Sequence, residues 1–342
     1  MIKSIAELTE KELTGKKILL RVDFNVPVVD GKIFETYRIK ANKETMDYLL
    51  SRGAKITLLS HITSVPSFEP LIDQIRLILG TEDFSLYENI RKYEGEEKND
   101  EEFAKNLAEP FDIYVNNAFS ASHRNHASLV AITKFLPSYA GLSLIKELAK
   151  LNEVLNAPKD GKTLILGGAK IETKFPVIKN FFDKAENILV GGAVANVFLK
   201  IKGVDIKKSL INDDFLAEAG EILKNFNFAI PEDYITADDM ILDIGPKTVE
   251  NFVKIIRGSR MIIWNGPVGK TEDEKFSVGS RKIAEAIINS GAFSIAGGGD
   301  TLAFLERIGL IDKFGYVSTG GGAMLEFLAG NKLPGLAVLG YE

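Results

Sequence analysis

The sequence predicts an α/β fold made of two doubly wound, Rossmann-like domains with mainly parallel sheets. First, its 342 residues exceed the usual size of one domain. Second, short apolar runs alternate with stretches of helical apolar spacing in both halves of the chain. Third, apolar runs in the second half end repeatedly in glycine clusters, as strands do where they turn into helices in such folds.

In the first half, three apolar runs predict parallel strands separated by helices: KILLRV (17–22), KITLLS (55–60) and DIYVN (112–116). A helix with leucines at spacings of three and four follows, at positions 144, 148, 151 and 155, and Pro158 ends it. We expect this helix, residues 143–157, to join a first domain over 1–142 to a second over 158–325.

The glycine clusters of the second half predict anion sites. They occur in LILGGAK (164–170), ILVGGA (188–193), IIWNGPVG (262–269), SIAGGGDT (294–301) and VSTGGGA (317–323). Glycine lets a phosphate approach the backbone, and the free amides at a helix start point toward it. The alternative is that these glycines only make turns. Because Lys170, Asp300 and Thr301 supply a cation, a carboxylate and a hydroxyl beside two of the clusters, we favour a nucleotide site.

Two familiar nucleotide fingerprints are absent. No G-x-G-x-x-G lies at a strand-to-helix turn, so an NAD site of the Rossmann type has no support. Gly269-Lys270-Thr271 looks like the end of a Walker A loop, but the first glycine of that motif would fall on Trp264. The partial match is therefore not a Walker A motif.

Composition limits the other function classes. A net charge of −5 argues against nonspecific nucleic-acid binding. The chain has no cysteine, which excludes disulfides and thiolate metal sites and fits a reducing cytoplasm. Its start lacks the apolar core of a signal peptide, and no run reaches membrane-spanning length. We expect a cytoplasmic protein with no nucleic-acid or membrane partner.

Basic residues gather at the predicted turns of the first half: Arg21, Arg38, His61, Arg91, His123 and Arg124. Taken singly, an arginine is more often part of a surface ion pair, and a histidine is more often a structural residue. Together they would form a basic patch that suits an anion. One guanidinium group can donate two parallel hydrogen bonds to two oxygens of a carboxylate or a phosphate. Asp23 and Asn25 could hold hydroxyls or orient the arginines.

Eight motifs in this order resemble the phosphoglycerate kinase family across residues 16–339: RVDFNVP (21–27), ENIRKYEGEEKNDEEFAKNLA (88–108), AFSASHRNHAS (118–128), GGAKIETK (167–174), DIGPKT (243–248), WNGPVG (264–269), GGGDT (297–301) and STGGGAMLEFLAGNKLPG (318–335). The resemblance implies two domains facing each other across a cleft, with residues 326–342 returning to the first. The implied reaction is the reversible transfer of a phosphoryl group from 1,3-bisphosphoglycerate to MgADP, giving 3-phosphoglycerate and MgATP in glycolysis and gluconeogenesis.

The resemblance also implies roles for single residues. Substrate-binding residues would be Asp23, Phe24, Asn25, Arg38, Ser60, His61, Arg91, His123 and Arg124. Nucleotide-binding residues would be Gly168, Ala169, Lys170, Lys174, Gly191, Asn265, Glu272, Gly297, Gly298, Gly299, Asp300 and Thr301, with Glu272 on the ribose and Asp300 at Mg²⁺. Catalytic residues would be Arg38, Lys170, Gly298 and Gly321. The partners are then ADP or ATP and the two phosphoglycerates, and the family expectation is a monomer.

In-line phosphoryl transfer needs positioning and charge neutralisation, and the carboxylate acceptor has no proton for a base to remove. We expect Arg38 and Lys170 to flank the transferring group. Because the two ligands would bind to different domains, the cleft would have to close, with hinge motion around the helix at 143–155.

Some positions depart from the family pattern. After Ser60-His61 the family usually continues Leu-Gly-Arg-Pro, but this chain reads Ile-Thr-Ser-Val, so Ser64 replaces an arginine and the following segment is shorter. Arg76 is a possible substitute. Asn117 replaces an aspartate, Ser120 a glycine, and Lys270-Thr271 the usual Val-Phe.

These departures leave two alternatives open. One is a catalytically weakened homologue that acts as a nucleotide-binding regulatory module, and the other is a kinase for a related carboxylate. The basic and lysine residues that remain favour the active kinase, and substrate competition would separate the second alternative from it.

Overall fold

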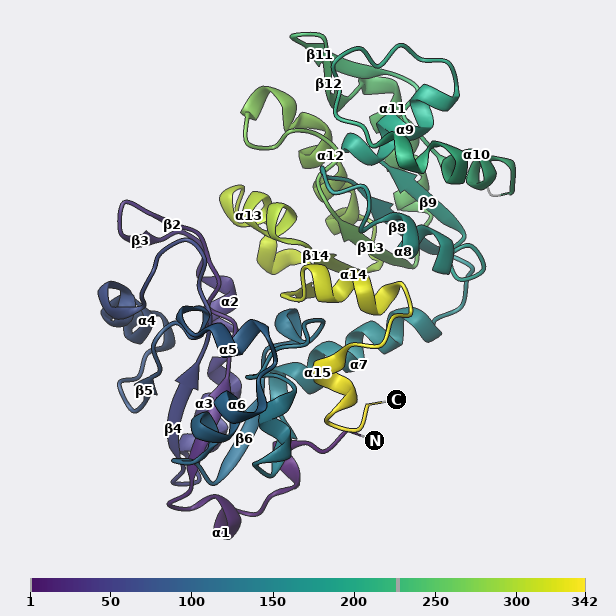
Figure 1. Ribbon diagram of the computed structural model, residues 1–342. Helices are drawn as coiled ribbons and strands as arrows, with labels where there is room; N and C mark the ends of the chain where they lie inside the picture. The colour runs from purple at the N-terminus through teal and green to yellow at the C-terminus, as the bar shows by residue number, and fades with distance from the viewer. Residues whose placement is uncertain (1, 226–227, 342) are drawn as a thin grey trace. The chain divides into compact units, whose positions relative to one another are not determined.

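The computed structural model describes residues 2–225 and 228–341 and divides the chain into two compact units (Figure 1). Unit 1 comprises Met1–Ala149 and Lys332–Glu342, and unit 2 comprises Lys150–Asn331. The first domain is predicted to comprise residues 1–142 and 326–342. Its first and last positions, 1 and 342, lie outside the described residues. The division falls within helix α7 (Leu142–Asn156), in the segment where the sequence predicts a connecting helix.

Unit 1 is built on a five-stranded parallel sheet of order β5-β4-β1-β6-β7. Its strands are β1 (Lys17–Arg21), β4 (Lys55–Leu59), β5 (Ser85–Leu86), β6 (Ile113–Asn116) and β7 (Ser138–Ala140). The apolar runs at 17–22, 55–60 and 112–116 are β1, β4 and β6, so these predicted strands are confirmed. Buried apolar residues dominate them because helices cover both faces of such a sheet.

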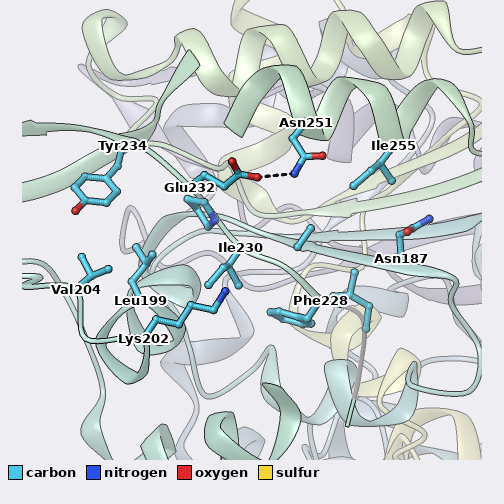
Figure 2. A pocket seen from close by; sticks show the side chains of 13 residues that line it. Asn187, Leu199, Lys202, Val204, Phe228, Ile230, Glu232, Tyr234, Asn251 and Ile255 are labelled. Carbon is cyan, nitrogen blue, oxygen red and sulfur yellow. Dashed lines mark hydrogen bonds between the residues drawn. The ribbon is translucent and has the colours of Figure 1, made fainter. Parts of the chain in front are cut away.

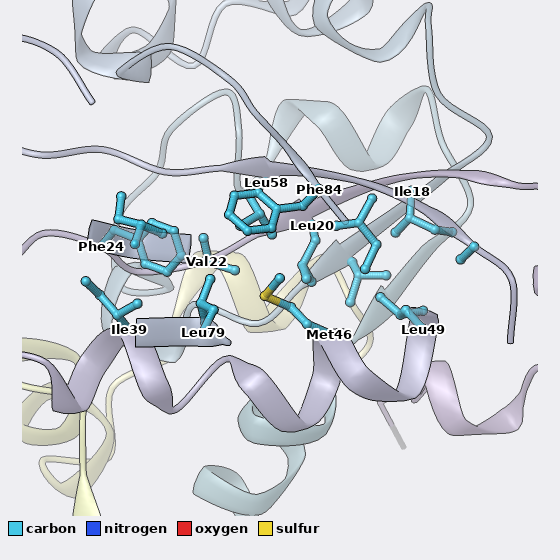
Figure 3. Packing of buried hydrophobic residues seen from close by; sticks show 14 of the residues in the cluster. Ile18, Leu20, Val22, Phe24, Ile39, Met46, Leu49, Leu58, Leu79 and Phe84 are labelled. Atoms are coloured by element: carbon cyan, nitrogen blue, oxygen red, sulfur yellow. The ribbon is translucent and has the colours of Figure 1, made fainter. Parts of the chain in front are cut away.

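Alternate residues of β1 face the two cores of unit 1. Ile18 and Leu20 join Met46, Leu49 and other buried side chains on one face of the sheet (Figure 3). Leu19 joins a separate buried cluster on the other face. This is the two-residue period of a strand, and it places β1 at the centre of the unit.

The helices of unit 1 are α1 (Glu10–Leu13), α2 (Tyr37–Lys40), α3 (Lys43–Leu50), α4 (Ile72–Leu79), α5 (Glu94–Glu97), α6 (Glu101–Ala108) and α15 (Pro334–Ala337). Local sequence signals set several of their ends. Asp100 caps α6 by accepting a hydrogen bond from the Phe103 amide at 2.7 Å. Gly80 ends α4 in the left-handed conformation, with φ at 69°.

Two further features complete unit 1. A hairpin of β2 (Val28–Val29) and β3 (Lys32–Ile33) is attached to α4 through the Gln74 side chain, which accepts from Ile33 and donates to Gly31. The C-terminal segment returns to the unit, and its helix α15 is drawn in yellow in Figure 1. The Gly335 amide there donates to the Ser122 carbonyl at 2.9 Å.

Unit 2 contains a six-stranded parallel sheet of order β10-β9-β8-β13-β14-β15. The strands are β8 (Lys162–Leu166), β9 (Asn187–Val190), β10 (Phe228–Ala229), β13 (Met261–Asn265), β14 (Phe293–Gly297) and β15 (Tyr316–Ser318). A separate antiparallel hairpin consists of β11 (Tyr234–Ala237) and β12 (Met240–Ile244). With two parallel sheets of five and six strands, the predicted α/β fold class is confirmed.

The helices of unit 2, besides its part of α7, are α8 (Phe175–Asn180), α9 (Gly192–Ile201), α10 (Leu216–Asn225), α11 (Pro246–Arg257), α12 (Val278–Asn289), α13 (Gly299–Arg307) and α14 (Gly322–Leu328). The rings of Phe175 and Phe198 stack between α8 and α9, with centroids 5.6 Å apart. Across the described ranges, no helix is both long enough and apolar enough to cross a membrane.

Candidate functional site

The winding of unit 1 reverses beside its central strand, β1. The chain winds from β1 to β4 and β5 on one side, then crosses to β6 and β7 on the other. In open parallel sheets, ligands bind where this reversal separates two loops at the carboxyl ends of the strands. The predicted substrate residues Asp23, His61 and Arg124 follow β1, β4 and β6, so the fold brings them to the same end of one sheet.

Both carboxylate oxygens of Asp23 have partners. Oδ1 accepts from the Asn25 amide at 2.9 Å, and Oδ2 accepts from the Ser120 hydroxyl and lies 3.5 Å from Arg38 Nη1. Burial raises the pKa of Asp23, but Arg38, His61 and these hydrogen bonds together hold it below its usual range. Asp23 is therefore an ionised, fixed side chain that orients its neighbours.

Arg38 projects from α2 into the same group. Its Nη1 donates to the Asn25 carbonyl at 3.1 Å, and its Nε lies 3.5 Å from a Glu35 carboxylate oxygen. A guanidinium has five N–H donors, so these contacts orient Arg38 and still leave donors for an anion.

His61 lies between two guanidinium groups. Arg21 Nη2 is 3.2 Å from its Nδ1, and Arg124 Nη1 is 3.0 Å from its Nε2. Burial lowers the pKa of His61 to about 3, and Arg21 lowers it further whereas Asp23 opposes the shift. The ring is thus neutral and carries one N–H, so only one of the two arginines can donate to it.

Arg21 itself is buried and fixed from several directions. It donates to the Val22 carbonyl at 2.5 Å and to the Ser128 hydroxyl at 3.0 Å. Ser128 in turn donates to the buried Glu96 carboxylate at 2.7 Å. Because Arg21 cannot turn away, His61 Nδ1 faces a fixed guanidinium donor, while Nε2 faces Arg124, and the tautomer of the ring decides which of the two nitrogens accepts.

The remaining cations are close enough to affect one another. Burial lowers the pKa of Arg91, and Arg124 and Arg21 lower it further. Arg91 also forms an ion pair with Glu97. His123 is half-buried, and it contributes to lowering the pKa of His126 to about 4, an effect led by burial and then by Arg91. The guanidinium groups of Arg21, Arg91 and Arg124 therefore lie close enough to lower the pKa values of both His61 and His126.

Two of the predicted substrate residues serve the scaffold in this structure. The Ser60 hydroxyl accepts from the Phe24 amide at 2.9 Å and donates to the Val22 carbonyl at 3.0 Å, so it shapes the turn after β1. The Phe24 side chain is fully buried in the core shown in Figure 3. Only the backbone of Phe24 is therefore available to a ligand.

The departures from the family pattern also have definite places. Ser64 donates to the Val26 carbonyl at 2.8 Å, and Arg76 pairs with Asp73 on its own helix at 3.4 Å. The Asn117 amide donates to Asn42 at 2.8 Å and accepts from Thr45 at 2.9 Å. Its oxygen also accepts from the Ser143 amide at 3.2 Å, at the start of α7.

In unit 2 the reversal of winding lies between β8 and β13. The turns that follow these strands and β9 hydrogen-bond to one another: Gly168 N donates to Pro267 O at 2.8 Å, and Gly192 N donates to Val268 O at 3.0 Å. A Cβ on Gly192, where φ is 56°, would lie 2.8 Å from the Gly168 nitrogen. Part of the glycine content therefore serves this close approach of turns, as the alternative interpretation of the sequence expects.

Around these turns the structure gathers a cation pair and a carboxylate. Burial lowers the pKa of Lys174 to about 8, Asp300 raises it and Lys170 lowers it. Lys170, Ala169 and Asp300 are exposed, whereas Lys174 is buried. Asp300 lies in the first turn of α13, whose positive dipole end faces the same region.

The start of α13 adjoins β13. Gly298 precedes the helix with φ at 95°, and a Cβ there would lie 3.2 Å from the Asn265 amide group. The Thr301 hydroxyl accepts from the Gly266 amide at 2.8 Å. Gly297 ends β14, so the loop from Gly297 to Thr301, Gly299 included, runs beside Asn265 at the carboxyl edge of the sheet.

Three further predicted residues lie in turns of unit 2. Gly191 is buried at the turn after β9, where its amide donates to Leu166 at 3.0 Å. Gly321 precedes α14 with φ at 52°. Glu272 is exposed and makes no hydrogen bond or ion pair with any residue in the described part of the chain.

A cavity of about 770 Å³ in unit 2 is separate from these residues. It opens beside β10 and includes Asn187, the first residue of β9, whereas the predicted nucleotide residues follow the last residues of their strands. Figure 2 shows Glu232 and Asn251 joined by a 3.1 Å hydrogen bond on its lining. None of the predicted site residues lines it.

Sequence reasoning missed some contributors to the unit 1 cluster. Thr63 donates to Asn25, Ser120 to Asp23, and Glu96 accepts from Ser128. Ser120 and Thr63 are distinguishable in the sequence only as departures from the motif. Nothing local marks Thr63 as a partner of Asn25.

The donor set of unit 2 fits Mg²⁺ held mainly by phosphate oxygens. Among the described residues, no group of three or more carboxylates and histidines could hold a metal ion alone. Asp300 offers one exposed carboxylate beside Lys170 and Lys174. Mg²⁺ commonly takes one or two protein carboxylates and completes its shell with phosphate and water.

Comparisons with known proteins all find the same family. A family model described as phosphoglycerate kinase matches residues 8–78 and 68–331. A phosphoglycerate kinase of Dictyoglomus turgidum is 40% identical over 98% of both chains, and one of Rubrobacter xylanophilus is 40% identical over 96% of both. The first alignment spans 390 positions, so that relative holds residues which this chain of 342 lacks.

Solved structures give the same result. Phosphoglycerate kinase from Pyrococcus horikoshii OT3 superposes with a TM-score of 0.89 at 30% identity, covering 99% of this chain and 98% of that one. The enzyme from Coxiella burnetii superposes with a TM-score of 0.84 at 33% identity, covering 99% of both.

Proposed function

This chain belongs to the phosphoglycerate kinase family, and from that premise we propose which of its residues bind the substrates and which assist the transfer. It is an ATP-binding kinase of glycolysis, a phosphotransferase whose acceptor is a carboxyl group. In our proposal the basic cluster of unit 1 binds 3-phosphoglycerate, and the glycine turns of unit 2 bind the nucleotide.

The glycerate ligand suits the charge and hydrogen-bonding groups of unit 1. Its phosphate and carboxylate need paired N–H donors, which Arg91, Arg124 and Arg38 provide. His61 Nε2 lies 3.0 Å from Arg124 Nη1, and we propose that the neutral ring carries its proton on this nitrogen when the substrate binds, so that His61 and Arg124 both donate to one oxygen anion. Asp23, being ionised, suits a donor such as the substrate hydroxyl, and Asn25 offers an amide.

The nucleotide phosphates suit the edge of the unit 2 sheet. Lys170 and Lys174 supply positive charge, and the amides at the start of α13 point toward the same region. Mg²⁺, which we expect beside Asp300, would neutralise phosphate charge. Asn265 and Glu272 are the residues we assign to contacts with the rest of the nucleotide.

In the transfer itself, these residues stabilise the charge of the transferring group and do not move protons. The attacking carboxylate is already ionised, so no general base is required. We assign Arg38 and Lys170 to the equatorial oxygens of the transferring group, with the backbone amides at Gly298 and Gly321 as further donors. Because Arg38 belongs to unit 1 and Lys170 to unit 2, catalysis would require both units.

One observation carries this proposal above the others. Asp23 and Arg124 follow β1 and β6 of unit 1, and in unit 2 Lys170 follows β8 while Asn265 ends β13. Both pairs lie beside the reversal point of a parallel sheet, where α/β folds bind ligands, and this supports the proposal. A protein retained only as a nucleotide-binding module would not need the cluster around Asp23 and His61, with its buried and fully partnered arginine Arg21.

The first test measures ATP- and magnesium-dependent consumption of 3-phosphoglycerate, coupled to NADH oxidation. We expect robust turnover, and a fall of about two to three powers of ten in kcat for Arg38→Ala and for Lys170→Ala, as is typical when one transition-state donor is lost. Exposed cations away from both sites, Arg257→Ala and Lys282→Ala, are the matched controls and should retain wild-type rates.

Each other outcome has a clear meaning. Turnover that survives both site variants would overturn the residue assignment. Absence of turnover with 3-phosphoglycerate, together with tight MgADP binding, would contradict kinase activity on this substrate, and competition with other phosphorylated carboxylates would then identify the acceptor.

We further propose a monomer that works in the cytoplasm, where glycolysis runs. The support is that one chain supplies both proposed sites. Light scattering coupled to gel filtration tests the oligomeric state.

A further inference from the structure

We propose that Thr63 and Ser120 are positioning residues of the glycerate site, whose hydroxyls hold Asn25 and Asp23 in their ligand-binding orientations. The inference rests on the proposed function, since it takes Asn25 and Asp23 as substrate contacts. It accounts for how this chain binds the substrate without an arginine at position 64.

Thr63 fixes Asn25 through two hydrogen bonds. Its backbone amide and its hydroxyl both donate to Asn25 Oδ1, each at 2.9 Å. Two donors on one atom identify that atom as the amide oxygen. The Nδ2 group of Asn25 is therefore the end that can donate to a substrate oxygen.

Ser120 fixes Asp23 in the same way from the other side. Its hydroxyl donates to Oδ2, while the Asn25 amide donates to Oδ1. Asp23 is also the partner of Arg38 at 3.5 Å. Ser120 thereby helps to hold the carboxylate that orients a proposed catalytic arginine.

The two hydroxyls flank the turn after the central strand. Thr63 follows β4 and Ser120 follows β6, and these strands pair with the two edges of β1. The turn bearing Asp23 and Asn25 is thus held from both neighbouring loops. A ligand that meets side chains already ordered does not have to supply the entropy of ordering them.

Both positions depart from the motif that this chain otherwise follows, in which each is glycine. Glycine has no hydroxyl, so the contacts with Asn25 and Asp23 could not form there. In the same loop Ser64, which replaces the arginine, donates to the Val26 carbonyl at 2.8 Å and brings no charge. The chain has lost one cation and gained two fixed polar side chains.

The test compares KM for 3-phosphoglycerate in Thr63→Val, Ser120→Ala and the double variant of the full-length chain. Each single change should raise this KM about 2- to 10-fold, the range expected for ordering one side chain, and the double change should raise it further. KM for MgATP, which binds to unit 2, should stay within error of wild type.

Three further variants separate positioning from a general structural role. Thr63→Ser retains a hydroxyl and should restore the wild-type KM. Ser64→Ala removes a neighbouring hydroxyl that contacts only backbone, and it should leave both KM values unchanged. Thermal melting of every variant reports whether a raised KM merely follows lost stability.

Asn25→Ala distinguishes the two levels of the proposal. If Asn25→Ala leaves KM for 3-phosphoglycerate unchanged, the assignment of the substrate site is wrong. If Asn25→Ala raises that KM but Thr63→Val and Ser120→Ala do not, the substrate site stands and the positioning role is overturned.

Discussion

At the scale of single residues, the neutral His61 links the charge of the unit 1 cluster to its stability. The ring is buried between Arg21 and Arg124, and Arg91 is also near enough to oppose its protonation. Asp23 alone among the facing groups favours the charged form. Protonation in the folded state would add a fourth cation where solvent cannot screen it.

This environment predicts acid sensitivity. The folded-state pKa of His61 is about 3 against an ordinary 6.5, so the unfolded chain binds more protons between these values. Stability is therefore unaffected by this group above pH 7 and falls as pH drops below 6.5. At pH 4.5, two units below the unfolded pKa and still above the folded one, the His61 contribution should have cost about 3 kcal/mol.

Urea unfolding at pH 7 and pH 4.5 checks the size of this loss. His61→Gln should lose about 3 kcal/mol less than wild type between the two pH values, because glutamine does not titrate. His123→Gln is the matched control, because His123 belongs to the same cluster but is only half-buried. An equal loss in wild type and His61→Gln would contradict the assignment.

Lys174 gives the corresponding prediction for unit 2. Its pKa of about 8, lowered mainly by burial, means that it loses its charge as pH rises through 8. If only the charged form binds phosphate, the Kd for MgADP should rise about fivefold between pH 8 and pH 9. Calorimetry on Lys174→Met should show weak binding with no such slope, while Lys170→Met should retain the slope. A slope that persists in Lys174→Met would exclude Lys174 as its source.

At the scale of elements, the start of α7 depends on Asn117, which stands where the family pattern has aspartate. The side-chain oxygen of Asn117 accepts hydrogen bonds from the Thr45 hydroxyl and the Ser143 amide. Its side-chain nitrogen donates to Asn42. We therefore interpret the change from aspartate as a matter of hydrogen bonding at a helix start rather than of charge in the patch.

The hairpin of β11 and β12 is closed by a two-residue turn. Ala237 pairs with Met240, and Asp238 and Asp239 between them have φ values of 51° and 62°. Two positive φ angles define a type I′ turn, in which Asn-Gly is favoured over two aspartates.

Replacing Asp238-Asp239 by Asn-Gly should therefore stabilise the protein by about 0.5–1 kcal/mol. The ion pairs of Asp239 with Lys207 and Lys208 are exposed and contribute little against this gain. Differential scanning calorimetry should show a raised Tm. Asp239→Val should lower it, because a β-branched residue is strained at positive φ, and unchanged or higher Tm for Asp239→Val would contradict the turn assignment.

At the scale of the whole molecule, the proposed sites belong to different units. Asp23, His61 and Arg38 lie in unit 1, whereas Lys170, Lys174 and Asp300 lie in unit 2. Reacting atoms must come within about 3–3.5 Å for transfer. We therefore expect the distance between the units to change when both substrates bind.

Fluorescence energy transfer tests this expectation cleanly, because the chain has no cysteine of its own. Cysteines at the exposed positions Lys105 and Lys282 place one dye on each unit. Transfer efficiency should change most with 3-phosphoglycerate and a nonhydrolysable MgATP analogue together, and less with either alone. Identical efficiencies in all four states would contradict a closure step.

Local patterns made much of the fold predictable. The strands at 17–22, 55–60 and 112–116 are visible as apolar runs because buried parallel strands need apolar residues on both faces. The short strand β7 and the hairpin β2–β3 carry no such signal, since two or three residues are too few to show a period. Phe24 illustrates the limit at the site, because the motif includes it while its side chain lies in the core.

The sequence by itself determined the α/β class, the family and the residue types available for anion binding, because these depend on composition, period and motif order. Only the tertiary structure decided which side chains meet. Thr63 and Asn25 are 38 residues apart and Ser120 and Asp23 are 97 apart, so their contacts depend on the order of β4, β1 and β6 in the sheet. The structure also showed that glycines such as Gly192 admit a neighbouring turn, a close approach that depends on how separate strands align.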